Sequence, residues 1–262
     1  MKARIKSGGL VAALLALSLW CPGQLKAGPG ELIQIPADLF DQSRPDTLGL
    51  ETIPGAETIT VFRPGEVDGA YNHGVVLMPF KGSLYAQWQN SARDEDSLDT
   101  RVLYSVCADG RQWSEPRLLV EDPDFAAHSN GGWWTDGETL VAYIVRWKHA
   151  GKAVRSGETV FITSTHGVNW TRPTPVSDQH GKAIDGVIEQ DPHRLPGSRI
   201  IGAFHEQPGL KLAPFYTDNP LATSGWTRGL MQNLPFDADT SRELEPSWFL
   251  RPDGAIVMIM RD

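Results

Sequence analysis

The strongest constraint on the fold is a pattern that repeats about every 57 residues. A glycine-bearing turn precedes a segment rich in β-forming residues four times, and the turn glycines are 55, 60 and 57 residues apart: Gly82, Gly137, Gly197 and Gly254. A glycine turn followed by β-formers is typical of a β-hairpin. A repeat of this length predicts structural units of one kind, each of which buries its faces against its neighbours.

A second marker follows each of the first three hairpins with the same period. It is a short turn that ends in tryptophan, and Trp113, Trp170 and Trp226 are 57 and 56 residues apart. Small antiparallel sheets of this length stack radially in β-propellers, whose blades have four strands. Long helical periodicity is missing. We therefore expect an all-β propeller of four-stranded blades, with about four blades in this chain.

The N-terminal residues have the composition of an export signal. Lys2, Arg4 and Lys6 precede an apolar run that is too short to span a bilayer. We expect residues 1–27 to be a signal peptide and residues 28–57 to be a lead-in segment. The partial propeller then covers residues 58–262. The protein is expected to be secreted or periplasmic, without a membrane span.

Charge and cysteine content exclude several classes of partner and site. The formal net charge is -8, and removal of residues 1–27 takes away four basic residues and no acidic ones. Nucleic acid is therefore excluded as a partner. Cys107 is the only cysteine after residue 27, so no internal disulfide can form. The compact motifs of metal and phosphate sites are missing, and we expect a monomer with no metal and no cofactor.

The turns before the first two tryptophans resemble the Asp-box of sialidases and related BNR-repeat propellers. They read Cys-Ala-Asp-Gly-Arg-Gln-Trp over residues 107–113 and Ser-Thr-His-Gly-Val-Asn-Trp over residues 164–170. In that family the box is a structural turn, so we expect Asp109 to accept hydrogen bonds from backbone amides. The resemblance implies six or seven blades in a full-length chain. We therefore expect that this sequence lacks the C-terminal blades.

The resemblance to sialidases implies a glycoside hydrolase that acts on an acidic or deoxy sugar. Asp94 lies in an acidic loop like the one that holds the general acid of sialidases. Glu245 corresponds to the glutamate that is paired with the nucleophilic tyrosine, and Arg261 to the second arginine that binds the substrate carboxylate. His73 stands where the first such arginine belongs, and it lacks the fixed charge and forked donors of arginine. The tyrosine and the third arginine normally come later in the chain.

A second resemblance, to ulvan lyases, leaves the reaction open. These propellers cleave uronate polysaccharides by β-elimination, with histidines, a tyrosine and an arginine. The corresponding candidates are His128, His149 and Tyr216 as catalytic residues and Arg228 as the clamp on the carboxylate. His205 follows the third hairpin and is a candidate for substrate binding.

A non-catalytic glycan-binding propeller is the third alternative. All three alternatives imply a glycan partner. Four tryptophans can either stack on sugar rings or pack between blades, and we expect packing: Trp88, Trp133, Trp134 and Trp147.

Overall fold

The structure is a computed structural model that describes residues 38–65, 69–121, 127–150, 154–232, 240–241 and 244–261. The expected signal peptide lies outside the described residues. The chain forms two compact units, Met1–Glu57 and Thr58–Asp262. In the described part of the chain, no helix has the length and apolar character needed to cross a membrane.

Successive turns make up the described part of the first unit, residues 38–57. The amide of Asp41 donates to the carbonyl of Leu48 at 2.8 Å. The Asp41 carboxylate also accepts hydrogen bonds from the amide and hydroxyl of Ser43, at 3.0 and 2.6 Å. These local bonds satisfy backbone groups in a segment whose described residues form no strand.

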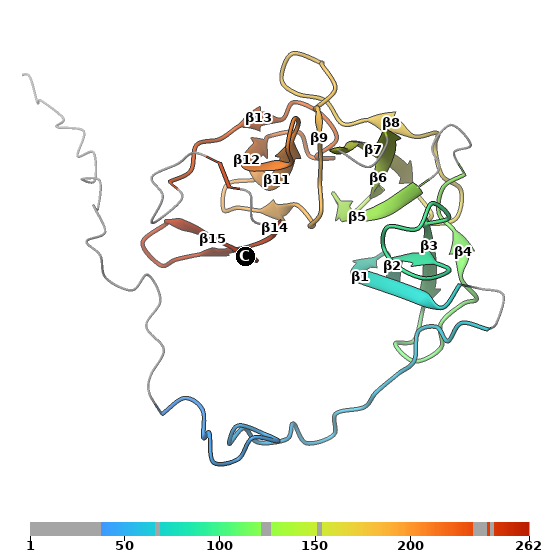
Figure 1. Ribbon diagram of the computed structural model, residues 1–262, viewed down its shortest axis with the longest axis vertical. Coiled ribbons are helices and arrows are strands. Elements are labelled where there is room, and N and C mark those ends of the chain that lie inside the picture. Colours follow the sequence, from blue (N-terminus) through green and yellow to red (C-terminus); the bar gives the residue numbers. More distant parts are fainter. Residues whose placement is uncertain are drawn as a thin grey trace, which may run out of the picture. The chain divides into compact units, whose positions relative to one another are not determined.

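Four antiparallel sheets make up the second unit and follow one another in chain order, from cyan to red in Figure 1. Blade 1 contains β1 (Tyr71–Phe80), β2 (Ser83–Ser91), β3 (Arg101–Cys107) and β4 (Arg117–Leu118). Blade 2 contains β5 (Ala127–Thr135), β6 (Leu140–Ala150), β7 (Val154–Ser164) and β8 (Thr174–Pro175). Blade 3 contains β9 (Gly186–Val187), β10 (His193–Arg194), β11 (Ile200–Glu206), β12 (Lys211–Thr217) and β13 (Thr227–Arg228). Blade 4 contains β14 (Leu244–Leu250) and β15 (Ile256–Arg261).

The predicted hairpins join neighbouring strands near the start of every blade. Their four glycines have positive φ angles of 81°, 101°, 87° and 85°: Gly82, Gly137, Gly197 and Gly254. Glycine reaches this region without the steric cost of a Cβ atom. The sequence repeat is thus a repeat of one turn geometry, and the predicted all-β propeller fold is confirmed.

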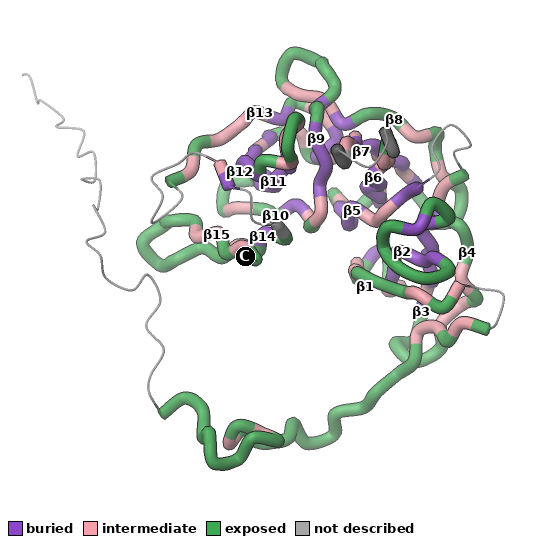
Figure 2. The backbone as a smooth tube through the Cα atoms, viewed as in Figure 1, coloured by how far each residue is buried: buried purple, intermediate pink, exposed green. Residues whose placement is uncertain are grey.

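Strand β6 shows how one blade packs against two neighbours. Leu140, Ala142 and Ile144 belong to a core cluster with residues of blade 1, whereas Val141 and Tyr143 belong to a cluster with residues of blade 3. All five are fully buried, and the core strands are purple in Figure 2. Successive side chains of a strand point to opposite faces, so a continuous apolar run serves both interfaces.

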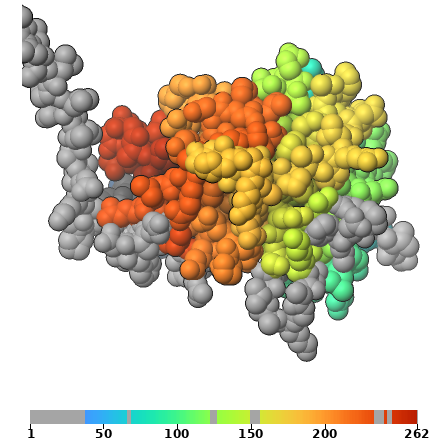
Figure 3. Space-filling model, turned by 90° about the horizontal axis from the view of Figure 1, so that it is seen from above, coloured from blue at the N-terminus to red at the C-terminus, as the bar shows by residue number. Residues whose placement is uncertain are grey.

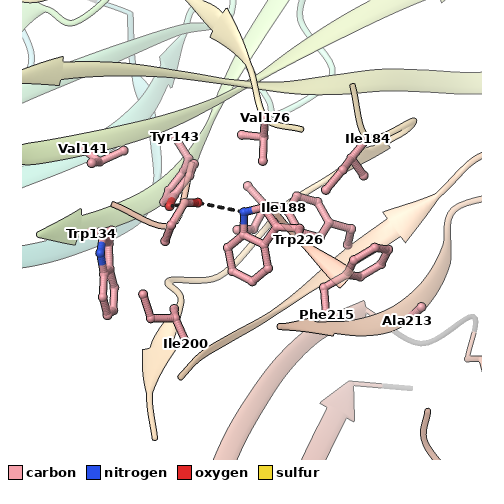
Figure 4. Close-up of a cluster of buried hydrophobic side chains, with 12 residues drawn as sticks. Trp134, Val141, Tyr143, Val176, Ile184, Ile188, Ile200, Ala213, Phe215 and Trp226 are labelled. Carbon is pink, nitrogen blue, oxygen red and sulfur yellow. Dashed lines mark hydrogen bonds between the residues drawn. The ribbon is translucent and has the colours of Figure 1, made fainter. Parts of the chain in front are cut away.

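The interface between blades 2 and 3 is closed by aromatic side chains that also make hydrogen bonds. Trp226 is fully buried and lies in the cluster shown in Figure 4. Its Nε1 atom and the hydroxyl of Tyr143 both donate to the carbonyl of Ala222, at 2.8 and 2.9 Å. The two blades form one continuous surface in Figure 3, from green through yellow to orange. This interface fixes the two blades against each other.

The first Asp-box is a structural turn, as expected. Asp109 Oδ1 accepts hydrogen bonds from the amides of Gln112 and Arg111, at 2.7 and 2.8 Å. These two bonds lower the pKa of the Asp109 carboxyl. Trp113 packs against the apolar cluster of blade 1, and Trp170 against the cluster between blades 1 and 2.

Candidate active site where the blades meet

A cavity of about 380 Å³ lies where the first strands of the blades begin, and all four blades line it. This volume is in the range of pockets for small ligands. Its polar lining side chains are His73, Gln89, Glu95, Ser129, Asn130, Glu189, Gln190, Glu245 and Arg261. Residues almost 190 positions apart in sequence meet here because a propeller turns the same end of every blade toward its axis.

Each blade departs from regular strand pairing where it lines the cavity. The register of β1 with β2 shifts after His73, that of β5 with β6 after Asn130, and that of β14 with β15 after Leu244. In blade 3, residues 188–192 leave the ladder between β9 and β10, which both pair with β11. Such bulges bend a strand and redirect its side chains. Here they bring polar side chains to the cavity.

Glu245 occupies a strained backbone position at the bulge of blade 4. Its φ angle is 57°, in the left-handed region, where the bulges of blades 1 and 2 have Gly74 and Gly132 at 65° and 94°. A side chain other than glycine in this region costs on the order of 1 kcal/mol. Strain of this kind gathers at functional sites. It marks Glu245 as a residue whose position matters more than its contribution to stability.

Arg261 and Glu245 form a two-point ion pair in the cavity. Arg261 Nε lies 2.7 Å from Glu245 Oε2, and Arg261 Nη2 donates to Oε1 at 3.1 Å. Strand pairing favours this contact, since the register of β14 with β15 places Leu244 opposite Arg261. Two parallel charge-assisted bonds hold the carboxylate in one orientation. The structure thus brings together two residues that the sequence assigned to one site.

The acidic loop after β2 contributes a different carboxylate from the one predicted. Glu95 lines the cavity, with its Oε2 atom 3.8 Å from His73 Nε2. Asp94 does not line it, and its Oδ1 atom accepts a hydrogen bond from the Ser97 hydroxyl at 2.9 Å. Asp94 therefore stabilises the loop, and its neighbour Glu95 faces the cavity.

Glu189 is a cavity carboxylate that the sequence analysis did not select. Its Oε2 atom lies 2.9 Å from His205 Nε2, although the two atoms lack the alignment of a hydrogen bond. His205 is only 1% exposed, so it lies behind Glu189 and does not line the cavity. One signal could have found Glu189, because His73, Asn130, Glu189 and Glu245 follow the same repeat of about 57 residues.

The bulge of β5 is bonded to both neighbouring blades, and Asp191 supplies the contact from blade 3. Its Oδ1 atom accepts a hydrogen bond from the amide of Trp133 in blade 2, and burial raises the pKa of its carboxyl to about 6. Gln87 of blade 1 donates to the carbonyl of Gly132 at 2.6 Å. A Cβ atom at Gly132 would overlap with the Asp191 carboxylate. The bulge of β5 is therefore held from both sides.

The candidates for a lyase reaction do not gather in the cavity. His128 is buried on β5, Tyr216 lies on β12, and Arg228 Nε lies 3.0 Å from Glu206 Oε2. None of these three lines the cavity. The side chain of His149 lies outside the described residues.

The four tryptophans divide into packing residues and one cavity residue. Trp88, Trp133 and Trp134 are buried in the core clusters, as expected. Trp147 lines the cavity, and its Nε1 atom donates to the Ser129 hydroxyl at 2.9 Å. Its ring offers a surface for stacking against a sugar. No group of three or more potential metal ligands occurs among the described residues.

A family model for the BNR repeat-like domain matches residues 82–262, more than half of the chain. The chain belongs to the BNR repeat-like family. The match covers strands β2, β3 and β4 of blade 1 and all described strands of blades 2, 3 and 4. A comparison with curated proteins finds no significant match for this BNR repeat-like chain.

Solved structures share the fold of the BNR repeat-like chain at low sequence identity. A protein of unknown function from Dyadobacter fermentans is 16% identical with a TM-score of 0.59, and the match covers 80% of this chain and 67% of that one. The GH32 β-fructofuranosidase of Bombyx mori is 11% identical with a TM-score of 0.51, and the match covers 74% of this chain and 41% of the enzyme. A mutant of that enzyme in complex with sucrose is 12% identical with a TM-score of 0.52, over the same shares. The chain thus spans less than half of the Bombyx mori enzyme.

Proposed function

We propose that this chain is a glycoside hydrolase whose reaction takes place in the cavity shared by the four blades. One observation carries the proposal: carboxylates of three different blades line a single cavity of about 380 Å³, namely Glu95, Glu189 and Glu245. Hydrolysis of a glycosidic bond needs two carboxyl groups, one as general acid and one as nucleophile or base. The fold shared with a β-fructofuranosidase supports the same reaction class.

Glu245 is suited to the role of nucleophile or base. Both of its oxygens are held by Arg261, which fixes the orientation of the carboxylate. The strained backbone at Glu245 fits a residue retained for chemistry. In this assignment the carboxylate acts on the sugar directly, without the tyrosine of the sialidase pattern.

Glu189 is suited to the role of general acid. It lines the same cavity as Glu245, from the neighbouring blade, and its Oε2 atom lies 2.9 Å from the Nε2 atom of the buried His205. A carboxyl group that lines the cavity can donate a proton to the glycosidic oxygen of a bound sugar. Trp147 would place the sugar ring by stacking.

Removal of either carboxylate tests the proposal. Glu245→Gln and Glu189→Gln should each lower kcat on 4-nitrophenyl glycosides by at least about 100-fold, since general acid or base catalysis contributes about that much. The melting temperature should change little, because both groups sit at the cavity surface. Released 4-nitrophenol and thermal unfolding are the two measurements.

Glu138→Gln is the matched control. Glu138 is an exposed glutamate at the turn between β5 and β6, 3.0 Å from Lys81, and it does not line the cavity. Its loss should leave turnover at the level of the unchanged protein. A product that absorbs ultraviolet light through a new double bond would instead identify a lyase, and glycan binding without any turnover would identify a binding propeller.

A further inference from the structure

The charges around the cavity indicate which class of sugar it accepts. Among the described lining residues, three carboxylates are accompanied by one guanidinium, that of Arg261, and one imidazole, that of His73. An anionic sugar would enter a concave site of mainly negative charge, where low-dielectric walls focus the field. The negative field repels an anionic sugar and does not repel an uncharged one.

The fork of Arg261 is already engaged by the protein. Its Nε and Nη2 groups face the two oxygens of Glu245, at 2.7 and 3.1 Å. A sugar carboxylate that took over these donors would displace Glu245 and leave it beside a second anion. Breaking an ion pair in this way removes the compensation for one of the two charges. The contacts leave the Nη1–Nη2 edge of the guanidinium for a substrate carboxylate, and Glu245 already offsets the charge of Arg261 there.

His73 does not replace the missing arginine of the sialidase pattern. Its nearest charged partner is Glu95, 3.8 Å away, and both side chains are about half exposed, at 52% and 54%. When protonated, the imidazole is balanced by this carboxylate. The described lining residues therefore offer no second cation for a substrate carboxylate.

The remaining polar groups suit sugar hydroxyls. Ser129, Asn130, Gln89 and Gln190 offer neutral donors and acceptors, and Trp147 offers an apolar ring. We infer that the cavity takes an uncharged glycoside and discriminates against its uronic acid counterpart. This inference rests on the proposed hydrolase function and names its substrate class.

Matched substrates test the inference. The probes are pairs of 4-nitrophenyl glycosides that differ only at C6, such as glucoside and glucuronide or galactoside and galacturonide, together with a sialoside. The neutral member of each hydrolysed pair should have a kcat/KM at least 100-fold higher than its acidic partner. A preference for an acidic member, or for the sialoside, would overturn the inference and leave the hydrolase proposal intact.

Direct binding separates failure of the inference from failure of the hydrolase proposal. If no probe is hydrolysed, titration calorimetry with methyl glucoside, methyl glucuronide, methyl galactoside and methyl galacturonide gives the same comparison without turnover. Tighter binding of the neutral members supports the inference even where the hydrolase proposal fails. Tighter binding of the acidic members, or binding of none, contradicts it.

A charge-removing pair of variants locates the source of the discrimination. Glu95→Gln should reduce the preference for the neutral member about tenfold, because one of the three cavity charges is lost. Glu138→Gln removes the same charge from an exposed turn and should leave the preference unchanged. An equal shift in both variants would show that the cavity carboxylates do not set the selectivity.

Discussion

At the scale of the residue, Asp191 makes the stability of the fold depend on pH. Its carboxyl lies under the bulge of β5 and accepts the amide of Trp133, and burial raises its pKa to about 6. The ordinary pKa of an aspartate carboxyl is 3.8. The folded protein therefore holds the Asp191 proton more tightly than the unfolded chain does. Stability from this group is present at low pH and is lost as pH rises through about 6.

Asp191→Asn should flatten this dependence. Between pH 4 and pH 7, the unchanged protein should lose up to about 3 kcal/mol of unfolding free energy relative to the variant, because only the unchanged protein has the titrating carboxyl. The amide oxygen of asparagine can still accept the amide of Trp133. Urea unfolding at a series of pH values measures the difference, and a constant difference would mean that Asp191 does not titrate in this range.

The residue scale also shows what sequence alone could and could not predict. Glu245 and Arg261 were found because a resemblance covers their hairpin, and their contact follows from strand register. Glu189 was missed because residues 188–192 leave the ladder and carry no strand pattern. The choice between Asp94 and Glu95 depends on which carboxylate binds Ser97, a detail of loop conformation that composition does not determine.

At the scale of the element, the bulges are the features that turn ordinary hairpins into a site. The repeated turn glycines and the apolar run of β6 predict the blades, since both follow from strand periodicity. The bulges after His73, Asn130 and Leu244 break that periodicity and could not be read from it. Tertiary contacts, such as the bond from Asn130 Nδ2 to the Gly74 carbonyl at 2.5 Å, support them instead.

Gly132→Ala should damage the bulge of β5 severely. The new Cβ would meet the Asp191 carboxylate, and φ at this position is 94°. Gly137→Ala is the matched control, since its φ is 101° but nothing lies within 4 Å of a Cβ there. In both variants the positive φ angle should lower the free energy of unfolding by about 1 kcal/mol. The steric overlap in Gly132→Ala should lower it by at least about 1 kcal/mol more. Equal losses in chemical denaturation would show that Asp191 moves aside freely.

At the scale of the whole molecule, stability depends on interfaces between blades. Tyr143 of blade 2 donates to the Ala222 carbonyl of blade 3 at 2.9 Å, inside the cluster that holds Trp226. Each such interface buries residues that one blade alone would expose. The same arrangement brings the four cavity-lining strands together, so folding and assembly of the site are one process.

Tyr143→Phe should weaken this coupling without emptying the core. Loss of the hydroxyl should lower the free energy of unfolding by about 1 kcal/mol, a moderate cost because Trp226 still donates to Ala222. Tyr216→Phe, which changes a partly exposed tyrosine of blade 3, should have a smaller effect. Thermal unfolding of the two variants gives the comparison, and equal effects would argue against the interface bond.

The attachment of Glu189 and Glu245 to separate blades has a mechanical consequence. The distance between the two carboxylates depends on the angle between the neighbouring blades that carry them. Repacking of large side chains far from the sugar can alter that angle by small steps. Evolution of a new glycosidic preference in this scaffold therefore has a route that leaves every lining residue unchanged.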